Sequence, residues 1–140
     1  ISNQKMKVLA IDYGTKRTGY AISDDSKIFA FGLSTQETKN NLAYLSQVIL
    51  KEKVDTIVIG LPKKLNNELA QIVPKIELFK RQLKNKFPEV QIFDMDERFT
   101  SKMAFQSMID SGMKKKDRQN KALVDEISAT LILQQYLETL

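Results

Sequence analysis

The first third of the chain alternates short apolar runs with polar turns. Apolar runs of strand length occupy Lys7–Asp12, Thr18–Ser23 and Ile28–Leu33, and the polar stretches "YGTKR" and "DDSK" lie between them. Runs of this length, bounded by glycine and polar residues, are typical of β-strands that are joined by short turns. The pattern therefore predicts an antiparallel meander of three strands.

The rest of the chain alternates between helical and strand spacing. Apolar residues three and four positions apart predict helices over Thr38–Glu52, Leu69–Lys86, Ser101–Ser111 and Leu123–Leu137. Continuous apolar runs predict buried strands in "DTIVIGLP" and "VQIFDMDE". Pro74 predicts either a kink in the second helix or a helix that begins close to the proline. The order predicts an α/β fold: a mixed five-stranded sheet with helices on both faces, as one domain over residues 1–140.

The absence of two residue types narrows the chemistry. The chain contains no histidine and no cysteine, which excludes a Ser-His-Asp triad, a thiolate nucleophile, a His/Cys zinc site and histidine-based ribonuclease chemistry. No apolar run approaches the ~20 residues of a membrane span, and no signal-peptide pattern is present. We therefore expect no membrane partner, and the lack of cysteine fits a cytoplasmic location. Residues 1–5 precede Met6, so the natural chain could begin at Met6 with these five residues as an addition.

Positive charge is concentrated near the end of the sequence. The formal net charge is +5, and the segment Gly112–Lys121 ("GMKKKDRQNK") holds five cations against Asp117, a local +4. The rest of the chain sums close to neutral. A charge run of this kind is often only solvated. This segment leads directly into Asp125, one of the candidate site residues considered next. We therefore expect the segment to contact phosphate groups of a substrate.

Three acids lie at the ends of predicted elements. Asp12 follows the four apolar residues of the first strand, Glu97 ends the last strand, and Asp125 is expected in the first turn of the last helix. Sites gather at the carboxyl ends of strands in open sheets, so Asp12 and Glu97 can meet if their strands are close. Ser128 and Ala129 are small neighbours of Asp125, which is expected to leave room for an ion.

Each acid also has a purely structural interpretation. Asp12 could accept backbone N–H groups in the turn at Gly14. Glu97 could pair with Arg98 or Lys102, and Asp125 could be stabilised by the helix dipole. Taken together, three acids beside a basic loop suit a hard cation better. The residues alone therefore predict a metal site next to an anion-binding loop.

Four motifs in this order resemble the YqgF (RuvX) family. They are "IDYGTKRTGYAISD", "VIGLP", "DERFTS" and "VDEISATLILQQYL", and the resemblance runs from Lys7 nearly to the C-terminus. Members of the family are described as Holliday-junction resolvases and as pre-16S rRNA nucleases, with a ribonuclease-H-like fold. The resemblance implies this fold and a hydrolase that cleaves phosphodiester bonds in structured nucleic acid.

The resemblance assigns the catalytic and metal-binding role to Asp12, Glu97 and Asp125. It implies Mg²⁺ or Mn²⁺, with two ions roughly 3.5–4 Å apart and bridged by Asp12. Phosphate contacts are expected from the cations Lys16, Arg17, Arg98, Lys114, Lys115, Lys116 and Arg118. The chain departs from the family in "KKLNNEL" (Lys63–Leu69), where a Met-Asp-Gly-like turn is usual, and in Ser128, where alanine is common. The first departure leaves the substrate contacts of that loop open.

Other classes of protein remain as alternatives. "IDYGT" before a small hairpin also resembles the first phosphate-binding motif of sugar kinases, actin and Hsp70-like ATPases. Those proteins pair two such domains around a nucleotide, whereas these 140 residues are expected to form one domain. A non-catalytic RNA-binding module would keep the fold and the basic loop. Within the nuclease interpretation, the expected substrate is the 5′ end of pre-16S rRNA. Resolution of branched DNA is the alternative, and it would require a dimer. The apolar helix faces fit one core, which favours a monomer.

Overall fold

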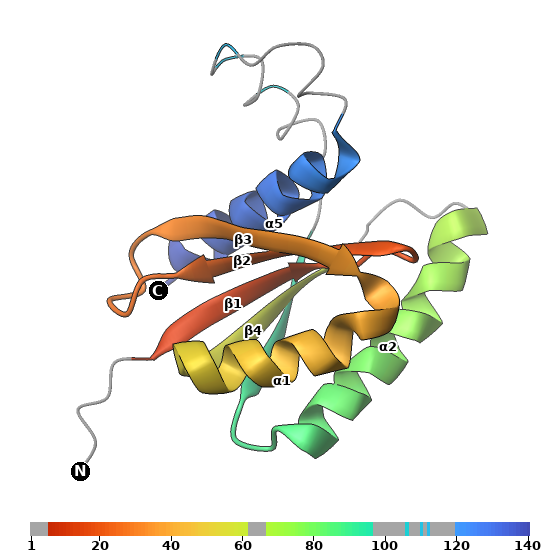
Figure 1. The fold of residues 1–140 in the computed structure, drawn as a ribbon, viewed down its shortest axis with the longest axis horizontal. Coiled ribbons are helices and arrows are strands. Elements are labelled where there is room, and N and C mark those ends of the chain that lie inside the picture. Colours follow the sequence, from red (N-terminus) through yellow and green to blue (C-terminus); the bar gives the residue numbers. More distant parts are fainter. Residues whose placement is uncertain (1–5, 62–66, 97–105, 107–109, 111, 113–119) are drawn as a thin grey trace.

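The computed structural model describes residues 6–61, 67–96, 106, 110, 112 and 120–140. Five strands form one mixed sheet in the order β3–β2–β1–β4–β5 (Figure 1). The strands are β1 (Lys7–Asp12), β2 (Arg17–Ser23), β3 (Ala30–Glu37), β4 (Val54–Leu61) and β5 (Gln91–Asp96). The helical elements are η1 (Thr38–Asn40), α1 (Asn41–Glu52), α2 (Asn67–Lys86) and α5 (Lys121–Leu137).

The sheet combines the two kinds of strand pairing that the sequence predicts. β1, β2 and β3 pair antiparallel, so the meander is confirmed. β4 pairs parallel to β1, and β5 pairs parallel to β4. β1 is therefore the central strand, and its carboxyl end lies at the same edge of the sheet as the carboxyl ends of β4 and β5. The predicted mixed five-stranded sheet is confirmed.

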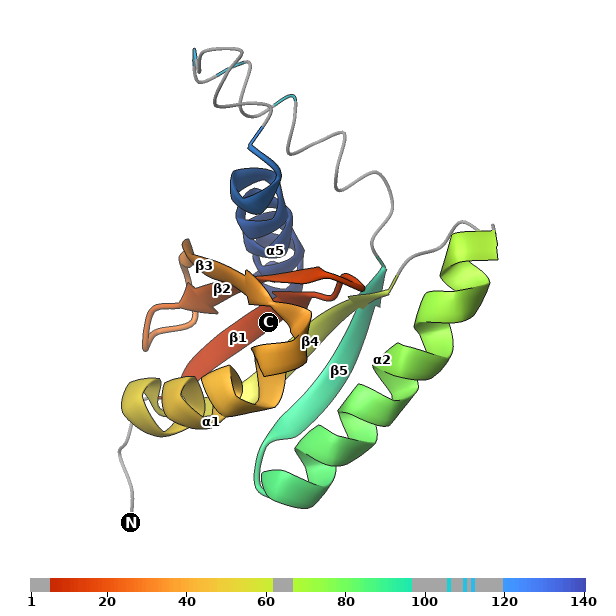
Figure 2. The same ribbon diagram turned by 45° about the vertical axis from the view of Figure 1, so that its right-hand side comes forward.

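Helices cover both faces of the sheet, as Figures 1 and 2 show. On one face, Leu9 and Ile11 of β1 pack in a core with residues of α1 and α2. On the other face, Val8 and Ala10 pack against α5. Successive residues of a strand point to opposite faces. An apolar run without polar interruption is therefore what a strand buried on both sides requires.

Several element boundaries differ from the prediction, and two of these differences decide specific expectations. Ile28 and Phe29 are 64% and 61% exposed and precede β3, because the Asp24 carboxylate accepts both of their backbone N–H groups, at 2.8 and 2.9 Å. These bonds fix a turn where the apolar pattern predicts a strand. α2 begins at Asn67, so Pro74 lies inside the helix and a start close to the proline is wrong.

A further finding concerns membranes. Within the described ranges, no helix has both the length and the apolar character that crossing a bilayer requires.

Candidate active site

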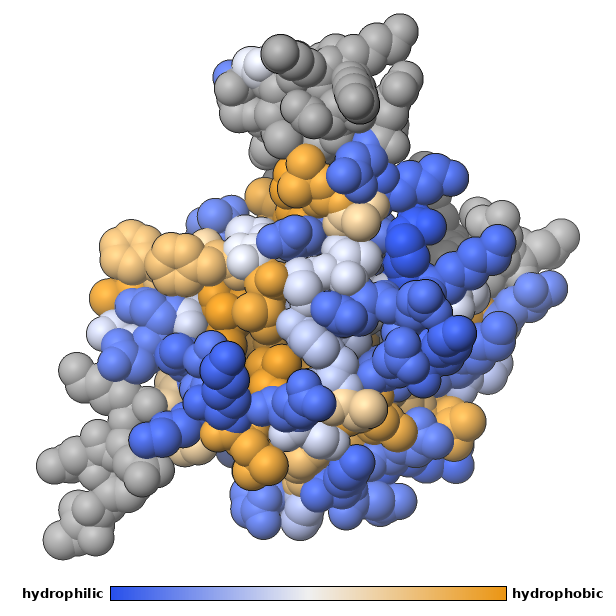
Figure 3. Space-filling model, in the orientation of Figure 1, coloured by the Kyte–Doolittle hydropathy of each residue, from blue (hydrophilic) through white to orange (hydrophobic). Residues whose placement is uncertain are grey.

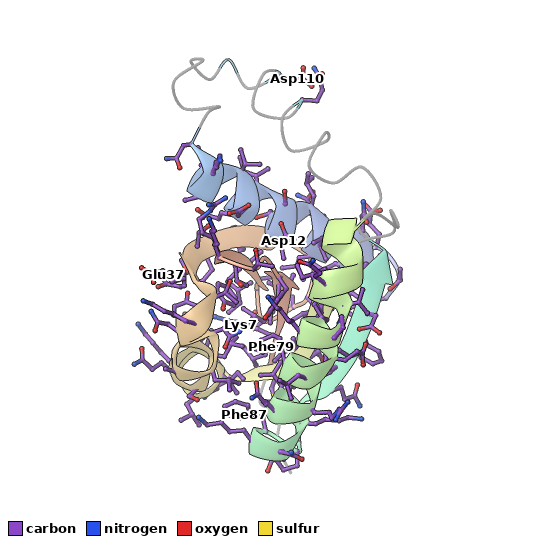
Figure 4. All side chains as sticks on the ribbon, turned by 90° about the vertical axis from the view of Figure 1, so that its right-hand side faces the viewer. Lys7, Asp12, Glu37, Phe79, Phe87 and Asp110 are labelled. Carbon is purple, nitrogen blue, oxygen red and sulfur yellow. The ribbon has the colours of Figure 1, made fainter. Side chains whose placement is uncertain are left out.

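Asp12 is held at the end of the central strand. It is partly buried and pairs with Gly19 across the antiparallel ladder of β1 and β2. The next residue, Tyr13, packs its ring against Phe79 of α2, with the ring centroids 5.3 Å apart. Figure 4 shows Asp12 near the carboxyl edge of the sheet, beside α2. The buried strand and the aromatic contact together fix where this carboxylate lies.

The turn after Asp12 is fixed by buried threonines. Thr38 Oγ1 donates to the carbonyl oxygen of Gly14 at 2.6 Å, and Thr38 N–H donates to the carbonyl oxygen of Lys16 at 2.9 Å. Since the one hydroxyl proton of Thr38 is used, Thr18 Oγ1 is the donor in its 2.8 Å contact with Thr38 Oγ1. Lys16 and Arg17 therefore project from an ordered turn beside Asp12.

Arg17 pairs with the second predicted acid. Its Nε donates to Oδ2 of Asp125 at 2.9 Å, with the two side chains 40% and 24% exposed. Burial raises the pKa of Asp125, although the Arg17 hydrogen bond and the charges of Arg17 and Lys121 lower it. A carboxylate that is partly withdrawn from water, with an adjacent cation, is typical of a functional site.

Gly19 brings Asp12 and Asp125 to the same place. A Cβ on Gly19 would overlap the backbone carbonyl oxygen of Asp125, so only glycine permits α5 to lie this close to β2. Gly19 is also the residue that pairs with Asp12. The two acids are therefore neighbours across a single strand position, although they are far apart in the sequence. Their carboxylates provide the oxygen ligands that Mg²⁺ and Mn²⁺ prefer.

One expectation about Asp125 is wrong. α5 begins at Lys121, because the Asn120 side chain caps it by accepting the N–H groups of Ala122 and Leu123. Asp125 thus lies beyond the first turn, where the helix dipole has little effect. The small residues that follow Asp125 were expected to leave room for an ion, and this stays a prediction, because their size also serves the packing of the helix. Ser128 and Ala129 are buried and let α5 pack closely on the sheet.

Several predicted site residues cannot be placed. Glu97 follows Asp96, the last residue of β5, and β4 separates β5 from β1. The residues that lie outside the described part of the chain are Glu97, Arg98, Lys114, Lys115, Lys116 and Arg118. Among the described residues, no group of three metal-ligating side chains is present. The structure thus brings together Asp12, Lys16, Arg17 and Asp125, and leaves the role of the others as a prediction.

Sequence analysis overlooked Gly19 and the threonine pair. An isolated glycine inside a strand pattern, as in "RTGYA", indicates close approach of another backbone. This signal was available, but it does not tell which segment approaches. Thr18 and Thr38 gave no such signal, because threonine is common in strands and at helix starts.

Comparisons with known proteins extend these observations. Residues 6–139 match the family model described as "RuvX: Holliday junction resolvase". A relative from Flavobacterium psychrophilum is 57% identical over 131 residues, which cover 94% of this chain and 96% of the relative. A relative from Bacteroides fragilis is 53% identical over 133 residues, which cover 95% and 96%. Both are named "Putative pre-16S rRNA nuclease".

Two solved structures share the fold at low sequence identity. The fowlpox virus resolvase, in complex with Holliday junction DNA, has a TM-score of 0.58 at 17% identity and covers 96% of this chain and 98% of its own. Thermus thermophilus RuvC, in complex with a Holliday junction substrate, has a TM-score of 0.58 at 16% identity and covers 96% and 94%. The ribonuclease-H-like fold is therefore confirmed. With a family match over residues 6–139 and relatives more than half identical, the chain belongs to the RuvX (YqgF) family.

Proposed function

We propose that this chain is a cytoplasmic, divalent-metal-dependent nuclease that hydrolyses phosphodiester bonds in the precursor of 16S rRNA. The observation that carries the proposal is the convergence of Asp12 and Asp125 through Gly19. The names of the relatives support RNA as the substrate. The chain has no histidine to act as a base, so carboxylates that hold a metal are the chemistry best suited to this site.

Each site residue has a definite task in this proposal. Asp12 and Asp125 hold Mg²⁺ or Mn²⁺, and Glu97 completes the ligand set. The bound ions supply an activated water and stabilise the leaving oxygen. Arg17 holds the Asp125 carboxylate at 2.9 Å, and Lys16 is exposed on the adjacent turn. These positions support a role for both cations in attracting the phosphate that is cleaved, and contacts to phosphate position a substrate without reading its bases.

Resolution of branched DNA is the second candidate. It is supported by the description of the family model and by the two resolvases that share the fold. A resolvase cuts two strands symmetrically and so acts as a dimer. We propose a monomer, which fits the cleavage of one RNA strand.

Both candidates can be tested in one experiment. The protein is incubated with precursor 16S rRNA and with a four-way DNA junction, under Mg²⁺ and under Mn²⁺, and the product ends are mapped. We expect cleavage of the RNA, and its loss in Asp12→Asn, which removes a charge and little volume. Asp25→Asn, the same change at an exposed residue of the β2–β3 turn, is the control.

The outcomes separate the candidates. Cleavage of the junction alone would favour the resolvase. Cleavage by Asp12→Asn at the wild-type rate would contradict the assignment of Asp12. Binding of RNA without cleavage under either metal would favour the non-catalytic RNA-binding module, and metal binding that requires ATP would favour the ATPase alternative.

A further inference from the structure

α2 carries a second concentration of positive charge. Its sequence contains five cations against Glu68 and Glu77, a net +3. When this and the +4 of Gly112–Lys121 are removed from the total of +5, the rest of the chain has a net charge of −2. The positive charge is therefore divided between two segments. The chain outside Gly112–Lys121 sums close to neutral only because the positive charge of α2 is offset by acidic residues elsewhere.

Most of the cations of α2 are available to a binding partner. Lys80 is held by Asp94 at 2.9 Å and by Glu77 at 3.7 Å. The other four cations of α2 are exposed and form no ion pair with any residue that the structure describes. They are Lys75, Arg81, Lys84 and Lys86. Lys84 and Lys86 lie in the last turn, where cations also stabilise a helix end. Lys75 and Arg81 lie before that turn, so the helix dipole does not account for them.

The remaining polar residues of this surface are also donors. Between Gln71 and Lys86, all of which are described, Glu77 is the one acidic side chain, and Lys80 pairs with it. The amides on the exposed surface are those of Gln71, Gln82 and Asn85. Lysine, arginine and amide side chains are the groups that bind phosphate and sugar oxygens in complexes with nucleic acids. Val73 and Leu78 are also exposed on this stretch of α2, and the cations and amides around them fit a phosphate backbone.

The position of α2 connects this surface to the candidate active site. Ile76, Phe79 and Leu83 are buried in the core, which fixes the opposite side of the helix toward solvent. Phe79 contacts Tyr13, the residue after Asp12. In Figure 3, hydrophilic residues dominate the surface on the side where Figure 1 places α2. A helix of 20 residues is about 30 Å long, which corresponds to roughly nine phosphate steps of 3.4 Å along one strand.

We propose that the exposed face of α2 binds the phosphate backbone of a duplex arm of the substrate, outside the bond that is cleaved. This inference rests on the proposed function, because it takes the substrate to be nucleic acid, and it adds that the substrate extends as a duplex past the active site. An acidic protein surface would also be attracted by the charge. The amide donors among the cations favour phosphate oxygens.

The test compares two pairs of substitutions that remove the same charge. Lys75→Gln/Arg81→Gln changes α2, and Lys51→Gln/Lys53→Gln changes exposed cations at the end of α1. Both are made in the Asp12→Asn protein so that the probe stays intact. The probes are RNA hairpins with stems of about 20 and about 6 base pairs, which are longer and shorter than the roughly nine phosphate steps of α2.

We expect the α2 pair to weaken binding of the long hairpin and to lower its salt slope by roughly two units, one for each phosphate contact. The α2 pair should change binding of the short hairpin much less, and the α1 pair should change binding of either hairpin much less. Unchanged affinity and slope, an equal loss on the short hairpin, or an equal loss in the α1 pair would each overturn the proposal. Any of these results would leave the proposed catalytic role of Asp12 untouched. Failure of the unsubstituted protein to bind or cleave nucleic acid would instead remove the proposed function itself.

Discussion

Arg17 and Asp125 lie 108 positions apart in the sequence and are joined by a 2.9 Å hydrogen bond from Nε to Oδ2. The sequence assigns Arg17 to phosphate binding and Asp125 to metal binding, and the structure shows that each is already the partner of the other. A metal cation that binds Asp125, or a phosphate that binds Arg17, must therefore either share its side chain with this hydrogen bond or break the bond. The two events are consequently linked.

The first prediction concerns the pKa of Asp125. Arg17 lowers this pKa, although burial raises it more. Arg17→Gln should therefore raise the pKa of Asp125 further, because the ionised carboxylate loses its charged donor. The pKa is measured by NMR titration of the carboxyl carbon in the metal-free protein. Lys16→Gln, a substitution in the adjacent exposed cation, is the control, and an unchanged pKa in Arg17→Gln would show that the pair does not form in solution.

The second prediction concerns the dependence of stability on pH. The pKa of Asp125 is raised in the folded protein by burial. Its contribution to stability is therefore fully present below the unfolded pKa and is lost as the pH rises through the folded pKa. Without metal, Asp125→Asn avoids this loss, so its free energy of unfolding should exceed that of the wild type at about pH 7 and not at about pH 3.

Denaturant unfolding in the presence of a chelator measures this difference. Asp25→Asn, at an exposed position, controls for the general effect of removing one negative charge. A pH-independent difference between Asp125→Asn and the wild type would contradict the prediction.

The third prediction concerns the approach of α5 to the sheet. The Cβ of Gly19→Ala would meet the backbone of Asp125, which cannot move without α5. We expect a loss of roughly 1–3 kcal/mol in the free energy of unfolding, together with weaker metal binding, because Asp125 is displaced. Gly32→Ala is the matched control. Its Cβ would meet the Glu126 side chain, which can turn away, so its loss should be smaller, and equal losses would argue against this account.

The fourth prediction concerns the basic segment. If Lys114, Lys115 and Lys116 contact substrate, changing all three to Ala should weaken binding and lower the salt slope by roughly one unit per lost contact. The cleavage rate at saturating substrate should stay near normal, and so should thermal stability, because lysines in a charged run are not expected to contribute to the core. Affinity is measured across a salt series. An unchanged slope would show that the segment is only solvated.

Local patterns predicted the central strand and the position of Asp12. The apolar run from Val8 to Ile11 requires a strand that is buried on both faces, and this strand ends at Asp12. The start of β3 was misplaced because the Asp24 carboxylate, rather than hydrophobicity, determines where Ile28 and Phe29 lie. A side-chain cap of this kind overrides the apolar pattern.

The environment of Asp125 could not be predicted from local patterns. Small residues such as Ser128 signal either room for a ligand or close packing of backbones, and only the tertiary arrangement distinguishes the two. The same holds for Gly19, whose signal of close approach does not name the partner. The sequence carries a signal for the start of α5, since Asn120 is among the preferred N-cap residues, but the same residue also belongs to the basic segment Gly112–Lys121.

The packing of α5 also has a consequence for the order in which the protein matures during translation. Val8, Ala10 and Ala21 belong to strands that leave the ribosome before α5, yet they are buried together with Ile132 and Leu133 of α5. Until α5 is synthesised, this face of the meander is uncovered, and long-range contacts of this kind form late in folding. With Asp125 as the proposed metal ligand, the site is expected to stay incomplete until α5 is in place, so a growing chain should not cleave nearby RNA before Asp125 reaches Gly19.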